Sequence, residues 1–202
     1  MTVEPPFSPA AERNRRPILS VLRRHVGPGC RVLEIGAGTG QHARCFAAEL
    51  PQVRWQASDL APNLPSLAAG LQTPGAPPLP APVALDVLHD DWPDGPFDAV
   101  YAANTAHIMS WPAVCAMLAG AARVLRPDGL LLIYGPFSRG GCHTSESNRR
   151  FDRELRGRDP AMGIRDLDDV DAEAARHGLE RAAEYAMPAN NLLVVWRRAA
   201  GI

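Results

Sequence analysis

The chain has 202 residues, of which 46% are hydrophobic and 21% charged, and this size and composition fit one globular domain with a well-buried core. All 21 basic residues are arginines, which excludes a phosphate-binding loop that needs lysine, a Schiff-base lysine and a lysine general base. The formal net charge of −1 disfavours a general nucleic-acid-binding protein, which would carry a basic surface.

The first predicted element is a helix. Ser8 and Pro9 are typical of an N-cap and a first helical position, and they predict a helix over residues 8–15 that Pro17 interrupts or restarts. An apolar stripe over residues 18–26 then predicts a further helical stretch that ends at a glycine-proline-glycine turn.

Alternating strands and helices follow this segment. The apolar runs predict strands near 31–36, 53–58, 83–85, 97–103 and 130–134, and helices near 41–50, 61–71 and 111–125. Residues 73–82 contain five prolines, so they are expected to form an irregular surface connection.

The alternation stops after the fifth strand. Residues 135–163 are polar, rich in arginine and longer than an ordinary connection, which indicates a segment that folds over something. A helix from Ile164 to the region of Gly178 and two strands at 179–187 and 191–198 complete the chain. Asn190 and Asn191 are expected to serve the turn between these strands by adopting positive φ or by capping the backbone. This order predicts an α/β fold, a doubly wound, mostly parallel sheet in a single domain over residues 1–202.

The segment 32–42 (Val-Leu-Glu-Ile-Gly-Ala-Gly-Thr-Gly-Gln-His) joins a strand to a helix through a glycine-rich turn. Three glycines let the backbone turn tightly and approach a ligand closely: Gly36, Gly38 and Gly40. A dinucleotide site prefers glycine where Gln41 stands, so this segment disfavours NAD or FAD. A glycine-rich turn without any ligand is the alternative.

Four polar residues fall at the ends of successive predicted strands: Glu34, Asp59, Asp86 and Asn104. Ligands of open α/β sheets bind outside this carboxyl edge. Asp59 lies 19 residues beyond Gly40, a spacing that fits a carboxylate bound to ribose hydroxyls. Each aspartate alone can be a turn residue or a helix cap, but their joint placement favours a nucleoside site.

The four cysteines are too widely spaced for a C-x-x-C pair or a zinc knuckle: Cys30, Cys45, Cys115 and Cys142. We expect reduced thiols and no metal site. The first residues have neither a basic nor an apolar region typical of a signal peptide, and no stretch reaches the ~18 to 20 apolar residues of a membrane span. The sequence therefore predicts a cytoplasmic protein without a membrane partner.

An acidic residue two positions before G-x-G-x-G resembles motif I of the class I S-adenosylmethionine-dependent methyltransferases. The resemblance implies S-adenosyl-L-methionine as the cofactor and a Rossmann-like, seven-stranded sheet of order 3-2-1-4-5-7-6 with an antiparallel strand seven. It implies that Glu34 complements a cation of the cofactor. The other cofactor-binding candidates that it implies are Gly36, Gly38, Gly40, Gln41, Asp59, Leu60, Asp86, Val87 and Asn104.

In this family the loop that follows strand four faces the reactive methyl group. His107 lies in that loop and can act as a general base, since an unperturbed imidazole has a pKa near ~6.5. It can equally only shape the pocket, because many nucleophilic acceptors need positioning alone. Tyr134, at the end of strand five, is the second catalytic candidate.

Matches over nearly the whole chain resemble the methyltransferase-like protein 26 family, among them Ala11-Glu12-Arg13-Asn14, Tyr134-Gly135-Pro136 and Gly163-Ile164-Arg165-Asp166. The resemblance implies that residues 1–28 lie over the cleft and that residues 135–163 form an acceptor lid. The candidate substrate-binding residues are Arg13, Asn14, Asn148, Arg156 and Arg165. A lid arginine can bind a carboxylate or phosphate of the acceptor, or it can pair with Asp152, Asp159 or Asp166 and hold the lid together.

Together these features predict a methyltransferase that acts on a small, polar, anionic acceptor at O, N or S. The alternative is a non-catalytic S-adenosylmethionine-binding or partner-regulating protein of the same fold. A nucleotide-sugar or dinucleotide enzyme is a third and weaker option, which Gln41 and the missing lysine disfavour.

Overall fold

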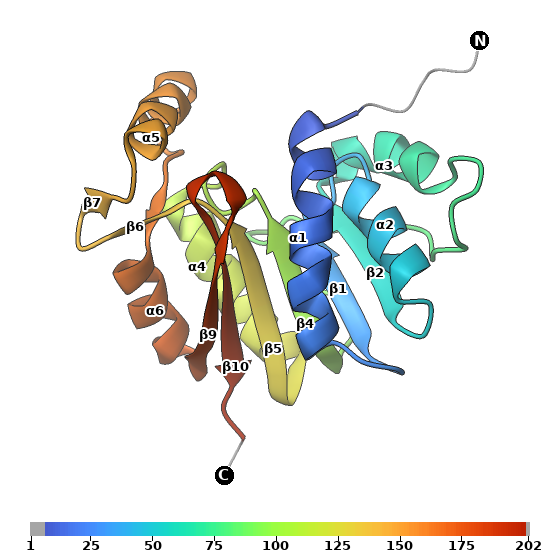
Figure 1. Cartoon of the computed structure of the whole chain (residues 1–202). Helices are drawn as coiled ribbons and strands as arrows, with labels where there is room; N and C mark the ends of the chain where they lie inside the picture. Colours follow the sequence, from blue (N-terminus) through green and yellow to red (C-terminus); the bar gives the residue numbers. More distant parts are fainter. Residues whose placement is uncertain (1–6, 201–202) are drawn as a thin grey trace.

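The computed structural model describes residues 7–200, which build a seven-stranded sheet of order β3-β2-β1-β4-β5-β10-β9 (Figure 1). Strands β1 to β5 are parallel, and β10 pairs antiparallel with both β5 and β9. The predicted order 3-2-1-4-5-7-6 is confirmed, because predicted strands six and seven are β9 and β10. The bounds are β1 (Arg31–Ile35), β2 (Arg54–Asp59), β3 (Val83–Ala84), β4 (Phe97–Ala103), β5 (Leu125–Gly135), β9 (Leu179–Met187) and β10 (Asn191–Arg198).

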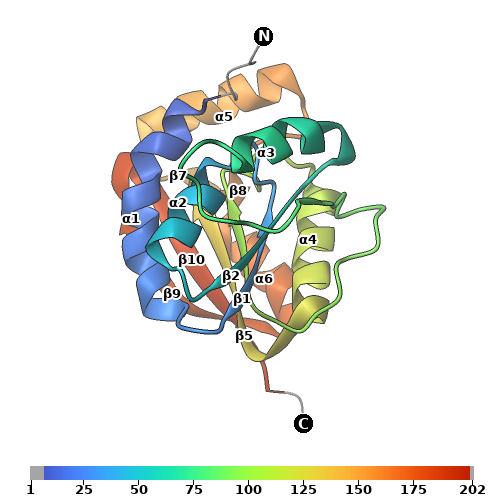
Figure 2. The ribbon, with the colours of Figure 1, turned by 90° about the vertical axis from the view of Figure 1, so that its right-hand side faces the viewer.

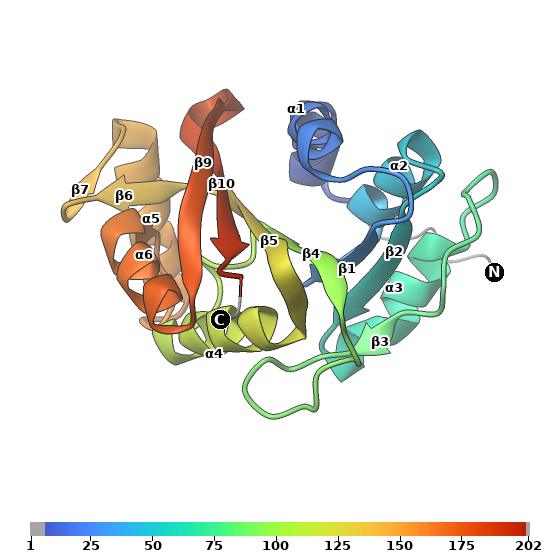
Figure 3. The same ribbon diagram turned by 90° about the horizontal axis from the view of Figure 1, so that it is seen from below.

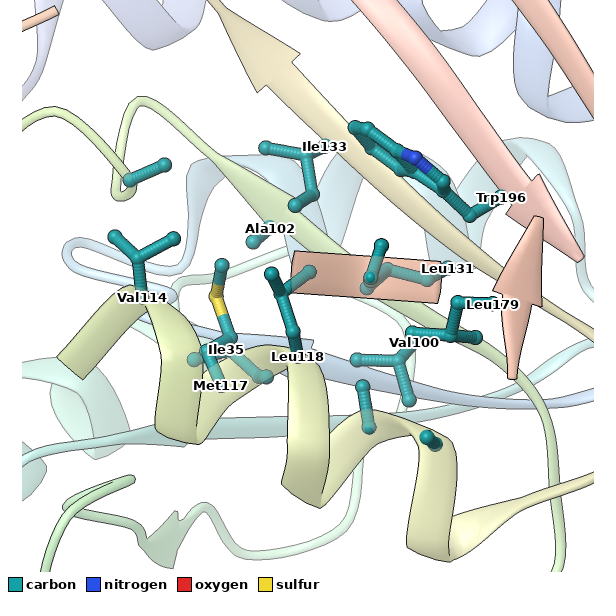
Figure 4. Packing of buried hydrophobic residues seen from close by; sticks show 14 of the residues in the cluster. Ile35, Val100, Ala102, Val114, Met117, Leu118, Leu131, Ile133, Leu179 and Trp196 are labelled. Atoms are coloured by element: carbon teal, nitrogen blue, oxygen red, sulfur yellow. The ribbon is translucent and has the colours of Figure 1, made fainter. Parts of the chain in front are cut away.

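Helices cover both faces of the sheet, as Figure 3 shows from below. On one face lie α1 (Pro9–His25), α2 (Gln41–Glu49) and α3 (Leu64–Leu71), and on the other α4 (Trp111–Val124) and α6 (Leu167–Arg176). The period of two along each strand sends alternate side chains into the two cores, with Val32 in the α1 core and Leu33 in the α4 core. Figure 4 shows Met117 and Leu118 of α4 packed against the strands.

The first helix runs without interruption from Pro9 to His25, so the predicted break at Pro17 is wrong. A proline inside a helix removes one N–H and frees the carbonyl four residues earlier, here that of Arg13. Arg13 is exposed, so water can satisfy that carbonyl. The helix is held by its buried face, which includes Ile18 and Leu22 at 0% exposure.

The fifth strand begins at Leu125, five residues earlier than the predicted start at 130. The Arg126-Pro127-Asp128-Gly129 stretch forms an irregularity within β5. Residue Phe97 of β4 is opposite Leu125 and Ala99 is opposite Leu130, so the register shifts there. Asp128 has φ of +60°, which aspartate tolerates better than most residues.

Residues 136–166, which include most of the predicted lid, form a small sheet and a helix. The sheet has the order β7-β6-β8, built from β6 (Phe137–Arg139), β7 (Cys142–His143) and β8 (Arg165–Asp166). Helix α5 (Glu146–Arg158) lies across the top of the molecule in Figure 2. The following helix, α6, begins at Leu167 rather than at Ile164, because the Asp166 side chain caps it by accepting from the Asp168 N–H at 3.0 Å.

The turn between β9 and β10 contains the short 3-10 helix Pro188–Asn190. Asn190 has φ of +58°, which confirms the conformation predicted for this turn, whereas Asn191 has extended backbone and begins β10. All four cysteines lie among the described residues 7–200 as free thiols. In the same range, no helix is long and apolar enough to cross a membrane.

Candidate functional site

A cavity of about 470 Å³ opens at the carboxyl ends of β1, β2, β3 and β4. This volume is in the range of small-molecule sites in proteins. Seven of the ten predicted cofactor residues line it: Gly36, Gly38, Asp59, Leu60, Asp86, Val87 and Asn104. The other three, Glu34, Gly40 and Gln41, do not. The structure therefore brings together residues that are up to 68 positions apart in the chain.

The glycine-rich loop forms one wall of this cavity. Gly36 and Gly38 both have positive φ, +68° and +57°. A Cβ atom at Gly36 would lie 2.9 Å from the Thr105 side chain, so no larger residue fits. At Gly38 a Cβ would meet nothing within 4 Å, which leaves bare backbone facing open space. A loop of this kind lets a ligand approach the main chain closely.

The Asp59 carboxylate lines the cavity next to the glycine loop and is largely buried, at 7% exposure. Its Oδ2 accepts from the Gly38 N–H at 2.7 Å, and its Oδ1 accepts from the Leu60 N–H at 2.8 Å and from Asn63 Nδ2 at 2.7 Å. A carboxylate has about four acceptor positions, so room remains for a hydroxyl donor. Asp59 thus fixes the glycine loop and still faces the cavity.

Apolar side chains form the rim opposite the glycine loop. Leu60, Leu88 and Ile108 are 46%, 46% and 49% exposed, unusual values for large apolar residues, and all three line the cavity. Asp86 lies beside them, where the Leu88 N–H donates to its Oδ1 at 3.0 Å and His89 lies 3.1 Å from its Oδ2. These two hydrogen bonds lower the pKa of Asp86, so the carboxylate is charged at neutral pH. The rim suits a flat apolar group with a polar edge.

Glu34 is the clearest correction among the predicted residues. It is 2% exposed and accepts from the Trp55 indole N–H at 2.7 Å, on the α1 side of the sheet and outside the cavity. Burial raises its pKa to about 8, so the side chain is mostly neutral at pH 7 and does not complement a cation. The alternation along β1 contains the missed signal, because Ile35 faces the cavity and its neighbour must face the other way.

Gly40 and Gln41 have structural contacts instead of cavity positions. A Cβ at Gly40 would lie 2.8 Å from the Leu71 side chain, so the glycine is needed for packing of α2 against α3. Gln41 Oε1 accepts from the Ser8 N–H at 2.5 Å and from the Thr39 hydroxyl at 2.9 Å. This side chain therefore ties the start of α1 to the glycine loop.

The two catalytic candidates lie at the ends of β4 and β5 but on opposite faces of the sheet. His107 is 6% exposed, its Nδ1 lies 3.5 Å from the ideal Cβ position of Gly135, and its ring is edge-on to Phe151 with centroids 5.2 Å apart. Burial, aided by the charge of Arg165, lowers the pKa of His107 to about 4. Tyr134 is 3% exposed and packs in the core under α1. Neither residue lines the 470 Å³ cavity.

The predicted lid arginines are occupied by contacts within the protein. Arg156 Nε donates to Asp152 Oδ2 at 2.9 Å, so Arg156 forms one of the aspartate pairs named as the alternative to acceptor binding, within helix α5. Arg165 donates instead to backbone carbonyls, to Ala106 at 3.1 Å and to Ala161 at 2.8 Å. Both arginines line a second cavity of about 650 Å³ between α5, α6 and the small sheet.

Contacts of α5 hold it over the strand edge. Asn148 Nδ2 donates to the Asn190 carbonyl at 3.0 Å, and Asn190 Nδ2 donates to the Ser147 hydroxyl at 3.2 Å. The Gly163 N–H donates to the His107 carbonyl at 2.9 Å. Asn148 therefore joins α5 to the β9–β10 turn. Arg13 and Asn14 are on α1, with Arg13 exposed and Asn14 buried.

Several site residues escaped sequence reasoning, among them Leu88, Ile108, Asn63 and Phe151. Leu88 and Ile108 stand beside predicted positions, and an exposed apolar residue in a polar loop was the signal that could have found them. Asn63 is found only through its hydrogen bond to Asp59, and Phe151 only through its contact with His107. Within residues 7–200, the structure has no cluster of three His, Cys, Asp or Glu side chains suited to a metal ion.

Several solved structures with the same arrangement are described as methyltransferases, one of them as S-adenosylmethionine-dependent. Human N-acetylserotonin methyltransferase in complex with SAM matches with a TM-score of 0.78 and 14% identity, over 95% of this chain and 53% of that one. An O-methyltransferase family protein from Burkholderia thailandensis matches with a TM-score of 0.77 and 17% identity, over 96% of this chain and 58% of that one. The mitomycin 7-O-methyltransferase MmcR matches with a TM-score of 0.77 and 19% identity, over 94% of this chain and 55% of that one. The chain thus spans little more than half the length of these proteins and shares their fold.

A family model also matches residues 5–198, nearly the whole chain. The description of that family states no function. The chain belongs to the family described as "Protein of unknown function (DUF938)", and residues 7–200 have the class I methyltransferase fold.

Proposed function

We propose that this protein is an S-adenosylmethionine-dependent methyltransferase that acts on a small, polar, anionic acceptor at O, N or S. The observation that carries the proposal is the 470 Å³ cavity, which gathers the glycine loop, two aspartates and an apolar rim at one edge of the sheet. Ligands of doubly wound sheets bind at this edge. The fold and its solved neighbours support the same class of cofactor.

The residues present fit this cofactor in three ways. Asp59 retains acceptor capacity for ribose hydroxyls, and Leu60, Leu88 and Ile108 offer apolar contact to an adenine ring. Gly36 and Gly38 leave bare backbone where the amino-acid end would pass. When bound, S-adenosylmethionine supplies an electrophilic methyl group on a sulfonium. Val87 and Asn104 complete the proposed cofactor contacts.

The acceptor is proposed to bind beyond the ends of β4 and β5, next to His107 and Tyr134 and beneath α5. His107 is neutral at pH 7, so it can accept a hydrogen bond from an acceptor hydroxyl or amine, and its low pKa makes it a weak base. Positioning of the acceptor would then supply most of the rate enhancement. Arg13, which is exposed, is proposed to attract an anionic acceptor, since Arg156 and Arg165 donate hydrogen bonds within the protein.

One observation favours the alternative of a non-catalytic binding or regulatory protein. The Phe151 ring packs edge-on against the His107 ring, with centroids 5.2 Å apart, so the proposed base is already in contact with an apolar side chain. Two measurements distinguish the functions. Calorimetry with S-adenosylmethionine and S-adenosylhomocysteine tests binding, and transfer of a radiolabelled methyl group into a metabolite extract tests catalysis. Binding with transfer supports the enzyme, binding without transfer supports the regulator, and no heat with either nucleoside refutes both.

Three further properties remain proposals. Motifs such as Ala11-Glu12-Arg13-Asn14 suggest kinship with the methyltransferase-like protein 26 family. The four free thiols fit a cytoplasmic location. The balanced charge supports a small-molecule substrate rather than nucleic acid.

A further inference from the structure

Residues 104–110 form the loop between β4 and α4, and this loop is one wall of the 470 Å³ cavity. Thr105, Ile108 and Met109 are among the loop residues that line the cavity. The Thr105 side chain also lies against the glycine loop, 2.9 Å from the ideal Cβ position of Gly36. The position of this cavity loop therefore affects both the shape of the cavity and the placement of its apolar rim.

The main chain of the cavity loop is bonded to a short segment that we call the latch (residues 161–165). Arg165 donates from Nε to the Ala106 carbonyl at 3.1 Å and from Nη2 to the Met109 carbonyl. Its Nη2 also donates to the Ala161 carbonyl at 2.8 Å, within the latch itself. One guanidinium thus joins two points of the cavity loop to the latch.

The latch supplies a further donor to the same stretch of main chain. The Gly163 N–H donates to the His107 carbonyl at 2.9 Å, so three of the four carbonyls over residues 106–109 accept from the latch. Ala106 and His107 are only 7% and 6% exposed. Buried carbonyls need hydrogen-bond partners, so these bonds hold the cavity loop in its observed conformation.

Packing alone does not explain why an arginine stands at position 165. Arg165 is only 9% exposed, and burial of a guanidinium has a desolvation cost that an apolar side chain would avoid. Its acceptors are carbonyls of the main chain rather than carboxylates. The planar fork of arginine can donate to several acceptors in fixed directions, which suits a side chain that fixes the conformation of a loop.

The latch is also attached to α5. Asp152 Oδ1 of this helix accepts from the Ile164 N–H at 2.7 Å. An ideal Cβ at Gly163 would lie 2.8 Å from Arg156 Cζ and 2.9 Å from Asp152 Oδ1, so a larger residue would push the latch away from α5. Helix α5 and the cavity loop are therefore both hydrogen-bonded to the latch.

We propose that Arg165 is a positioning residue of the cofactor site, and that the latch couples the position of α5 to the shape of the 470 Å³ cavity. The inference rests on the proposed function, which assigns this cavity to S-adenosylmethionine. A cofactor that contacts Thr105 or Ile108 binds more tightly when their loop is already held in place, because less ordering accompanies binding. By linkage, a bound cofactor stabilises the latch and its contact with α5 in return.

Calorimetry with S-adenosylhomocysteine tests the role of Arg165. Arg165→Gln removes the charge and the fork, and Arg165→Lys keeps the charge alone. Arg176→Gln is the matched control, because Arg176 also lines the second cavity but pairs with Glu173 on α6. The affinity should decrease about 3- to 30-fold in Arg165→Gln, by less in Arg165→Lys and not at all in the control.

Thermal unfolding of the same variants distinguishes positioning from a purely structural role. A purely structural arginine would lower the Tm of both Arg165 variants but leave the affinity of the folded protein unchanged, and that result would overturn the proposal. An equal loss of affinity in Arg176→Gln would overturn it as well, because the effect would then not depend on the latch.

Hydrogen exchange of the wild type needs no variant, so it decides the inference if the Arg165 variants do not fold. Bound S-adenosylhomocysteine should slow exchange of the Gly163 and Ile164 amides, although neither residue lines the 470 Å³ cavity. The Gly178 amide, which donates to the Ala175 carbonyl at the end of α6, is the internal control and should not change. Unchanged exchange in the latch would contradict the coupling.

A wild type that gives no heat with S-adenosylhomocysteine refutes the proposed function instead. The latch is then tested without a ligand, through the Ile108 and Met109 amides, which donate to the Thr105 carbonyl at 3.0 and 3.2 Å. Faster exchange of these two amides in Arg165→Lys than in the wild type and in Arg176→Gln would support a loop held by the latch. Equal exchange in all three proteins would refute it.

Discussion

Replacement of Glu34 by glutamine should stabilise the protein, with a gain that depends on pH. Burial raises the pKa of Glu34 from 4.5 to about 8, an effect that the Trp55 hydrogen bond opposes and Asp59 reinforces. Each pKa unit corresponds to about 1.36 kcal/mol, so at pH 7 the folded state is destabilised by about 3 kcal/mol relative to a side chain that cannot ionise. Glutamine keeps an acceptor for the Trp55 N–H, which is 2.7 Å from Glu34 Oε2.

The sign of the effect follows from the raised pKa. The protonated form of Glu34 supports the full stability of the folded protein below pH 4.5, and this contribution to the free energy of unfolding is lost as pH rises through about 8. Urea unfolding of the wild type and Glu34→Gln from pH 4 to 8.5 should therefore show a difference that begins near zero and grows with pH. A constant difference, or a variant that is less stable at pH 8, would refute the reasoning. Unchanged affinity for S-adenosylhomocysteine would further separate Glu34 from the cofactor.

Two substitutions and one titration test the cavity and the loop beside it. Asp59→Ala should weaken the binding of S-adenosylhomocysteine by about 1–3 kcal/mol in calorimetry. Asp98→Ala is the control, because Asp98 lies at the opposite edge of the sheet and accepts from the Arg31 N–H at 2.8 Å and from Arg126 Nε at 2.6 Å. This variant should leave the affinity unchanged. Equal losses in the two would contradict the ribose contact. Ile108→Ser should cost roughly 1 kcal/mol of the same affinity with little change in Tm, since Ile108 is 49% exposed before binding. His107 should titrate near pH 4 by NMR, and a midpoint near 6.5 would refute its burial. Because the folded state lowers the pKa of His107, its contribution to the free energy of unfolding should be fully present above pH 6.5 and be lost as pH falls through about 4.

The apolar pattern was sufficient to predict the sheet. The apolar runs at residues 130–134 and 97–103 lie in strands, as predicted, and the resemblance supplied the strand order. The same pattern placed Asp59 and Asp86 at strand ends, which is where a parallel sheet gathers side chains into one cavity.

Helix α5 and the Glu34 side chain show which features such reasoning does not predict. Helix α5 buries only Asn148, Asp152 and Leu155, so the sequence has no apolar periodicity that predicts this helix. Its position depends on polar contacts with the β9–β10 turn. The identity of Glu34 suggested a charge at the cofactor, but the face on which it lies and the neighbouring Trp55 determine that it is neutral. The alternation along β1 indicates the face on which Glu34 lies, but its contact with Trp55 and the contacts of α5 have no signature in local sequence.

A crystal structure of the protein grown with S-adenosylhomocysteine would test the central claim most directly. The account predicts the nucleoside in the 470 Å³ cavity, with its ribose hydroxyls hydrogen-bonded to Asp59 and its adenine between Leu88 and Ile108. A nucleoside bound instead in the 650 Å³ cavity beside Arg156, or a glycine loop without any contact to it, would contradict the account.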